Sequence, residues 1–140
     1  MSNYLLFNPV SIVHYRNIRL FENNNDGLGI RCILNPKFPW FSKGTPIKYD
    51  FSYFNNDRVS KGAFNDVKAV IVFSAQPRAC PMHLIQEAVF RSIPVIAVQE
   101  GYQMMLEQGY VNEYFLPVDH LFVCSDFERE KFIEIGKPMN

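Results

Sequence analysis

The second half of the chain alternates between continuous apolar runs and segments with helical periodicity, and this alternation restricts the fold more than any other feature. Residues 67–73, VKAVIVF, are almost all apolar, which predicts a strand buried on both faces. Pro81 suits the first position of a helix, and an apolar stripe follows it at helical spacing. Residues 95–98 and 121–124 predict two more strands. Strands separated by helices are expected to pair in parallel, because tight turns cannot connect parallel neighbours.

The first half of the chain begins in the same way with weaker patterns. Residues 4–7, YLLF, predict a short strand, and Ser11 suits the cap of a helix that reaches about Glu22. Residues 30–35, IRCILN, predict the second strand, and the alternating residues 48–54 predict a third. The predicted fold class is therefore α/β, a Rossmann-like three-layer sandwich with a mainly parallel sheet.

The composition indicates one soluble domain without a strong electrostatic field. With 140 residues, 48% of them hydrophobic, residues 1–140 are expected to bury one core as a single domain. Fourteen basic and fourteen acidic side chains cancel, which argues against nucleic acid as a partner. Cys32 and Cys124 lie in apolar runs and the cysteines are odd in number, which favours buried thiols and a cytoplasmic location. No apolar run approaches the roughly 20 residues that span a bilayer. Peripheral contact with a membrane surface stays open.

Polar residues follow each predicted strand, and in an open parallel sheet these strand ends share one edge. Ligands bind at that edge because loop side chains and helix amino termini converge there. Capping of the next helix explains Ser125 and Asp126. Gly101 permits close approach of the backbone or a positive φ, and for the Gln-Glu pair before it a ligand role and a plain turn role stay equally open. The candidate contacts at this edge are Asn8, Gln76, Gln99, Glu100 and Gly101.

Histidine and cysteine residues supply further candidates. His14 shares a helical face with Ile18 and Phe21, and a ligand role and a buried, hydrogen-bonded histidine are equally open for it. Cys80 and His83 have Cys-x-x-His spacing, but no metal site is expected because a second pair of ligands is missing. No cofactor is expected either, since the first turn, FNPVS, is neither glycine-rich nor hydroxyl-rich as a flavin or nucleotide site requires.

Residues 67–138 also follow a family pattern. It consists of a buried strand, a helix, an Ile-Pro pair before a strand that ends in a polar residue and glycine, and then an aspartate, a serine and a glycine. The pattern resembles the amino-terminal half of GT-B glycosyltransferases of bacterial surface polysaccharides, specifically the glycerophosphate transferases of teichoic acid synthesis and the related UDP-N-acetylglucosamine 2-epimerases. Before residue 67 the resemblance is only topological. The matching residues are Ile93-Pro94, Glu100-Gly101, Asp119, Ser125 and Gly136.

This resemblance implies a function that the residue patterns alone do not supply. The domain would be the acceptor-binding half of a GT-B enzyme and would hold a sugar or a lipid-linked sugar at the carboxyl edge of the sheet. Glu100 would act there as general base or as an acceptor contact. The nucleotide-sugar donor would be held by a second domain or chain, so we expect this chain to be inactive alone. The implied acceptor contacts are Asn8, His14, Gln76, Gln99 and Gly101.

The chain departs from the family at two positions of the pattern. Epimerases carry Gly-Asp after the fourth strand and Val-Glu-Ala-Gly after the fifth, whereas residues 73–76 are FSAQ and residues 98–101 are VQEG. Epimerase chemistry is therefore not expected. The glycerophosphate transferases usually place histidine where Glu100 stands. Two other functions stay open: a free-standing flavodoxin-like binding module, and a subunit that scaffolds a catalytic partner.

Overall fold

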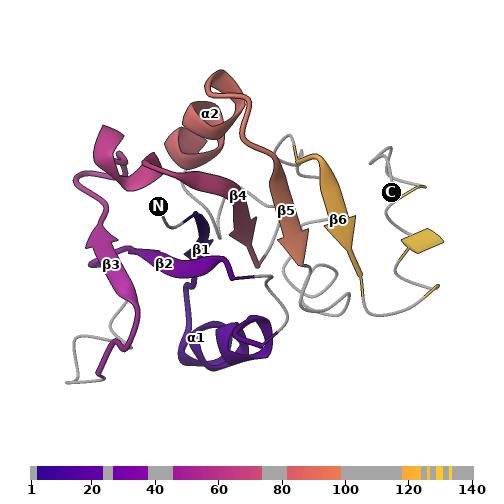
Figure 1. Cartoon of the computed structure of the whole chain (residues 1–140). Coiled ribbons are helices and arrows are strands. Elements are labelled where there is room, and N and C mark those ends of the chain that lie inside the picture. Colours follow the sequence, from indigo (N-terminus) through magenta and orange to yellow (C-terminus); the bar gives the residue numbers. More distant parts are fainter. Residues whose placement is uncertain are drawn as a thin grey trace.

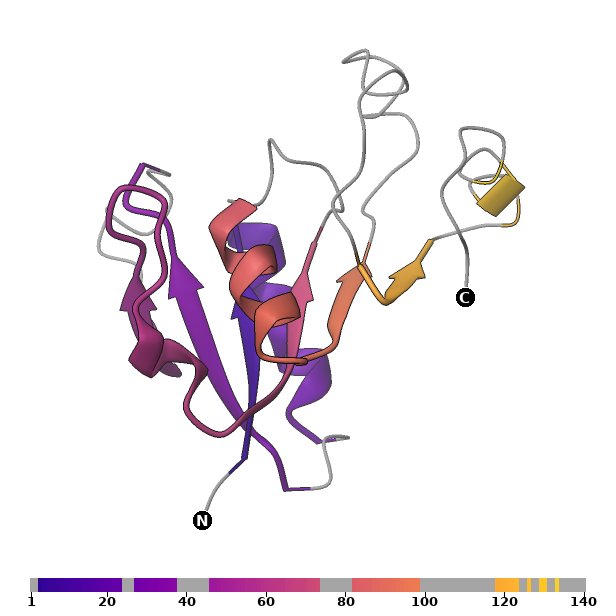
Figure 2. The same cartoon turned by 90° about the horizontal axis from the view of Figure 1, so that it is seen from above.

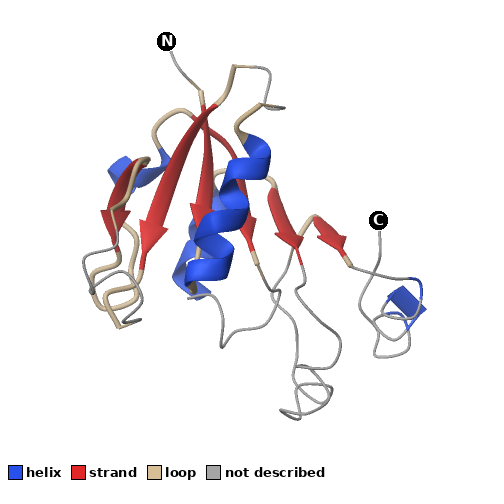
Figure 3. Cartoon of the chain, turned by 90° about the horizontal axis from the view of Figure 1, so that it is seen from below, coloured by secondary structure: helices blue, strands red, loops and turns tan. Residues whose placement is uncertain are grey.

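Six strands form one sheet in which every pairing is parallel. The computed structural model describes residues 3–23, 27–37, 46–73, 82–98 and 118–123, together with residues 126, 129, 130 and 133. The strand order is β3-β2-β1-β4-β5-β6, and all six arrows point to the same edge of the sheet (Figure 3). The strands are β1 (Tyr4–Asn8), β2 (Gly29–Leu34), β3 (Asp50–Tyr53), β4 (Val67–Val72), β5 (Val95–Val98) and β6 (His120–Phe122).

Helices cover both faces of the sheet. Helix α1 (Ile12–Asn17) continues into the 3-10 helix η1 (Ile18–Phe21) on one face, and α2 (Met82–Phe90) packs on the other (Figure 1). A second 3-10 helix, η2 (Lys61–Phe64), lies in the connection from β3 to β4. This arrangement confirms the predicted α/β class and the Rossmann-like fold with helices on both sides of a parallel sheet.

The core has two layers because side chains alternate between the faces of each strand. On the α2 face, Leu6, Ile33 and Val70 belong to a buried cluster that includes Leu84 and Ile85 of the helix. The cluster on the α1 face contains Phe7, Cys32 and Ile71 together with Ile18 of η1. The central strands are therefore buried on both sides, as their continuous apolar runs predict.

The predicted elements differ from the observed ones mainly at their ends. Ser11 caps α1 as expected, since its Oγ accepts a hydrogen bond of 3.2 Å from the backbone N–H of His14. The α-helix itself ends at Asn17, and the chain tightens into η1 up to Phe21. The third predicted strand, residues 48–54, shortens to β3. Residues 126, 129, 130 and 133 are helical, in agreement with the helix expected after residue 125.

The strand order distinguishes between related architectures. The order reverses between β1 and β4, as in the doubly wound folds with order 3-2-1-4-5-6. Flavodoxin-like proteins have the order 2-1-3-4-5 instead, so the flavodoxin-like shape considered as an alternative does not apply. Among the helices of the described segments, none is both long enough and apolar enough to cross a membrane.

Candidate functional site

The candidate site lies at the carboxyl edge of β1 and β4, where the strand order reverses. Asn8 ends β1 and pairs in register with Val72, the last residue of β4. From this point α1 follows β1 on one face of the sheet, while α2 lies on the opposite face (Figure 2). The connections therefore diverge here, and ligands of open α/β sheets bind at such a point because the diverging loops leave a crevice.

Asn8 is the most unusual polar residue of this edge. It is 1% exposed, and within the described parts of the chain neither its Oδ1 nor its Nδ2 has a hydrogen-bond partner. Alternation along β1 directs the side chain to the face of Leu6 and α2. Each unpaired buried polar group costs about 1–3 kcal/mol, so the amide is an unexplained cost unless something binds to it.

His14 lies on the other face and serves the packing of α1. Its side chain is 3% exposed, and its ring stacks on that of Phe73 with 4.5 Å between centroids. The ring Nδ1 accepts a hydrogen bond of 3.1 Å from the backbone N–H of Val10, so in the neutral ring the proton is on Nε2. No hydrogen bond joins His14 to Asn8 in the described structure. The geometry thus favours a buried, hydrogen-bonded histidine over a ligand contact shared with Asn8.

Helix α2 adds an electrostatic preference at the same edge. A crossover helix runs antiparallel to its strands, so α2 (Met82–Phe90) begins on the side where the strands end (Figure 2). Met82 packs against the same cluster as Leu6, on the face of the Asn8 side chain. The amino terminus of a helix carries a partial positive charge, which favours an anionic or strongly polar group nearby. The other predicted contacts, Gln76, Gln99, Glu100 and Gly101, lie outside the described residues.

Asn35, at the carboxyl end of β2, has a purely structural explanation. Its Oδ1 accepts a hydrogen bond of 3.0 Å from the backbone N–H of Lys37, and its Nδ2 donates to Asp57 Oδ1 at 3.3 Å. Lys37 Nζ also lies 2.7 Å from Asp57 Oδ2. The hydrogen bond with Lys37 is the main cause of the lowered pKa of the Asp57 carboxyl. Unlike Asn8, this buried amide has its partners within the protein.

His83 and Asp119 also have structural roles. The Nδ1 atom of His83 accepts a hydrogen bond of 2.8 Å from the backbone N–H of Val59, which ties α2 to the connection after β3. Asp119 Oδ2 accepts from the backbone N–H of Val95 at 2.7 Å and so fixes the start of β6 beside β5. The described residues contain no group of three or more histidine, cysteine or acidic side chains that could hold a metal ion. Cys80 is outside them.

The chain matches no protein-family model and no curated protein sequence. The family resemblance of residues 67–138 therefore rests on the sequence pattern itself. The class that the fold defines is that of Rossmann-like α/β domains, with a candidate ligand site at the switch in strand order.

Proposed function

We propose that this domain binds a polar ligand at the carboxyl edge of β1 and β4, and that the ligand is the sugar or lipid-linked sugar acceptor of a glycosyltransferase. The observation that carries the binding role is the buried Asn8 side chain, whose two polar atoms have no partner in the described structure. Native proteins rarely leave such a group unpaired. A ligand that pairs with it recovers the cost of its burial.

The chemistry of an amide suits a polyhydroxylated ligand. The Nδ2 atom of Asn8 donates two hydrogen bonds and Oδ1 accepts up to two. A pair of neighbouring sugar hydroxyls offers both an acceptor and a donor, so it can satisfy both ends of one amide. The amino terminus of α2 on the same face would favour a phosphate group, as found in a lipid-linked sugar.

Transfer would also require a site for the nucleotide-sugar donor. In the proposed enzyme a second domain or another chain holds the nucleotide-sugar donor. Glu100 would act as general base toward the acceptor hydroxyl or as a direct contact to it, with Gln76, Gln99 and Gly101 beside it. His14 would hold α1 on the opposite face of the sheet through its stack on Phe73. Contact with a membrane surface would follow if the acceptor carries a lipid.

A titration followed by amide NMR tests the binding role. The probes are N-acetylglucosamine 1-phosphate and glucose 1-phosphate, and the amides of Asn8, Val10 and Phe73 report on the site. We expect saturable shifts at these amides, and we expect Asn8→Val to weaken binding by at least about tenfold. Gln86→Val, on the exposed side of α2, is the matched control and should bind like the unmodified protein. Equal affinity of Asn8→Val and the unmodified protein would refute the proposal.

A further inference from the structure

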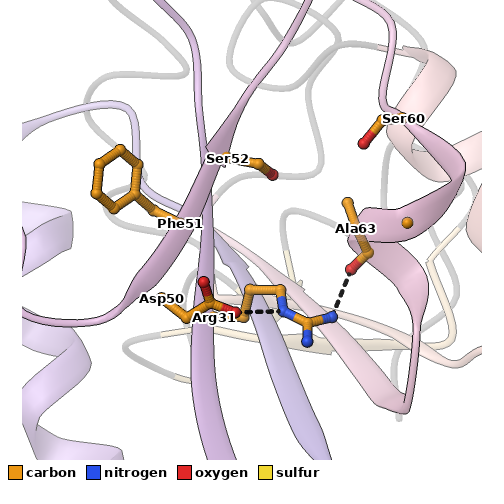
Figure 4. A pocket seen from close by; sticks show the side chains of 7 residues that line it. Arg31, Asp50, Phe51, Ser52, Ser60 and Ala63 are labelled. Atoms are coloured by element: carbon orange, nitrogen blue, oxygen red, sulfur yellow. Dashed lines mark hydrogen bonds and ion pairs between the residues drawn. The ribbon is translucent and has the colours of Figure 1, made fainter.

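A polar pocket separate from the Asn8 site lies on the α2 face, beside the edge strand β3. It has a volume of about 220 Å³ and opens between β3 and the 3-10 helix η2 (Figure 4). Asn8 is two strands away, on β1, and Ile33 of β2 is buried between them on the same face. At the usual strand spacing this separates the two places by roughly 10 Å. The lining residues used below are Arg31, Asp50, Ser52, Ser60, Gly62 and Ala63.

Arg31 forms one wall of the pocket and is held rigidly. Its Nη1 donates to the backbone carbonyls of Ala63 at 3.0 Å and Asn65 at 2.8 Å. Its Nε donates to Asp50 Oδ2 at 3.0 Å, and the guanidinium carbon lies 4.0 Å from the centre of the Tyr4 ring. Only 13% of the side chain is exposed. These contacts fix the shape of the wall before any ligand arrives.

The charge of the pocket favours a neutral ligand. Arg31 and Asp50 cancel, and the Asp50 side chain is 60% exposed, so its second oxygen, Oδ1, is accessible as an acceptor. The Asp50 carboxylate would repel an anion, and three of the five N–H groups of Arg31 already donate to Asp50 and to the two backbone carbonyls. Neutral hydroxyl groups, in contrast, can donate to the carboxylate without any charge to compensate.

Two serine hydroxyls complete the polar lining. The Ser52 hydroxyl points from β3 toward the side of the pocket where Ser60 lies (Figure 4). Ser52 Oγ is buried and has no hydrogen-bond partner in the described residues. Ser60 precedes η2, yet its side chain makes no capping hydrogen bond. Rotation about one side-chain bond is enough to bring a serine hydroxyl to a ligand.

The volume restricts the size of the ligand. The pocket has a volume of about 220 Å³. That is too small for a nucleotide or a drug-sized molecule, whose pockets begin near 300 Å³. It is enough for a single sugar ring or a smaller polyol.

We propose that this pocket binds a small neutral polyhydroxylated ligand, of the size of one monosaccharide or less. Its hydroxyls would donate to Asp50 Oδ1 and exchange hydrogen bonds with Ser52 and Ser60. The sequence did not point to the pocket, because Arg31 stands within an apolar strand and Ser52 within an alternating one. This site is independent of the one at Asn8 and does not require the proposed transferase function.

The test is an amide NMR titration of the whole chain with glucose, myo-inositol and glycerol up to about 50 mM, a range suited to weak ligands. We expect saturable shifts confined to the amides of Ser52, Ser60, Gly62 and Ala63. The blocking variant is Gly62→Leu, because a Cβ at Gly62 would meet only Asn65 Nδ2, at 4.0 Å, and the backbone there does not require glycine. It should weaken binding by at least about tenfold, whereas Gln86→Leu, which adds the same side chain on exposed α2, should not.

A double variant, Ser52→Ala with Ser60→Ala, removes the hydroxyls without filling the pocket and should also weaken binding. The proposal is overturned if none of the three probes shifts these amides, if the shifts survive in Gly62→Leu, or if inorganic phosphate shifts them more than the neutral probes. Shifts at Asn8 and Phe73 with no change at Ser52 and Ser60 would overturn this site alone and leave the proposal for Asn8 standing.

Discussion

The His14 ring stacks on the Phe73 ring with 4.5 Å between their centroids and 11° between their planes, and this contact joins α1 to the residue that follows β4. Ser11, three residues earlier, caps the same helix. The two interactions hold α1 against its face of the sheet, close to the end of β1 at Asn8. His14 therefore has a packing role in the described structure, on the face of the sheet opposite the Asn8 side chain.

Replacing His14 with alanine is expected to lower the free energy of unfolding by about 2–4 kcal/mol, because the change leaves a cavity beside Phe73 and leaves the Val10 N–H without its acceptor. Urea denaturation measures this difference. Val13→Ala on the same helix is the control, since Val13 is 52% exposed and should cost less than about 1 kcal/mol. A smaller loss for His14→Ala than for Val13→Ala would contradict the packing role.

Asn8→Val should raise the free energy of unfolding by about 1 kcal/mol in the absence of ligand. The substitution removes two buried polar atoms that have no partner in the described structure and supplies a β-branched side chain to a strand. Asn35→Val should do the opposite and lower stability by about 1–3 kcal/mol, because that amide is hydrogen-bonded to Lys37 and Asp57. Thermal and urea unfolding of the two variants would expose the contrast, and a destabilised Asn8→Val would show that the amide is paired in solution.

Arg31→Met is expected to cost about 2 kcal/mol, because the backbone carbonyls of Ala63 and Asn65 lose their shared donor and Tyr4 loses the guanidinium above its ring. Asp50→Ala should cost less than about 1 kcal/mol, because this partner of Arg31 is 60% exposed to solvent. Equilibrium unfolding of both variants measures whether Arg31→Met loses more stability than Asp50→Ala. Equal losses would mean that the ion pair, and not the carbonyl contacts, holds Arg31.

The buried thiol of Cys32 is expected to lower the free energy of unfolding at high pH. Burial, with a smaller contribution from the charge of Asp50, raises the pKa of its thiol from 9.0 to about 12. The folded state therefore holds the proton more tightly than the unfolded state. The resulting stability is complete below pH 9 and is lost as the pH rises from 9 toward 12, with a slope of up to about 1.4 kcal/mol per pH unit.

Urea unfolding of the unmodified chain and of Cys32→Ala between pH 8 and 10.5, about the range in which a free thiol titrates, isolates this contribution. The stability of the unmodified chain should fall more steeply above pH 9 than that of the variant. Alkylation with iodoacetamide, followed by mass spectrometry of the Cys32 peptide, should also be slow in the folded protein. Parallel pH profiles for the two proteins would show that the thiol is accessible to water.

Much of the fold was predictable because the local patterns agree with the tertiary structure. The apolar runs at residues 67–73 and 95–98 correspond to β4 and β5, and Ser11 caps α1 as its position suggests. Errors are found at element ends, such as the change from α1 to η1 after Asn17. Such ends depend on how the last turn packs, which a sequence pattern does not contain.

The candidate site was predictable only in its location. Asn8 and Asn35 are both asparagines at the end of an apolar strand, and the sequence alone does not show which of them has a hydrogen-bond partner. The structure separates them, because Asn35 finds Lys37 and Asp57 whereas Asn8 finds no partner among the described residues. The pocket beside Arg31 could not be predicted from the sequence. The partners of Arg31, Ala63 and Asn65, are more than 30 residues away, and the residues next to Arg31 in sequence do not indicate a pocket.

The amino-acid order by itself determined the alternation of buried strands and amphipathic helices, and with it the parallel sheet covered on both faces. This follows because burial depends on the period of apolar residues, which is a local property of the chain. Only the tertiary structure decided the strand order, the pocket beside Arg31 and the burial of the Asn8 amide without a hydrogen-bond partner among the described residues. These features depend on contacts between segments far apart in sequence. A polar group finds a hydrogen-bond partner only if the fold brings one within reach.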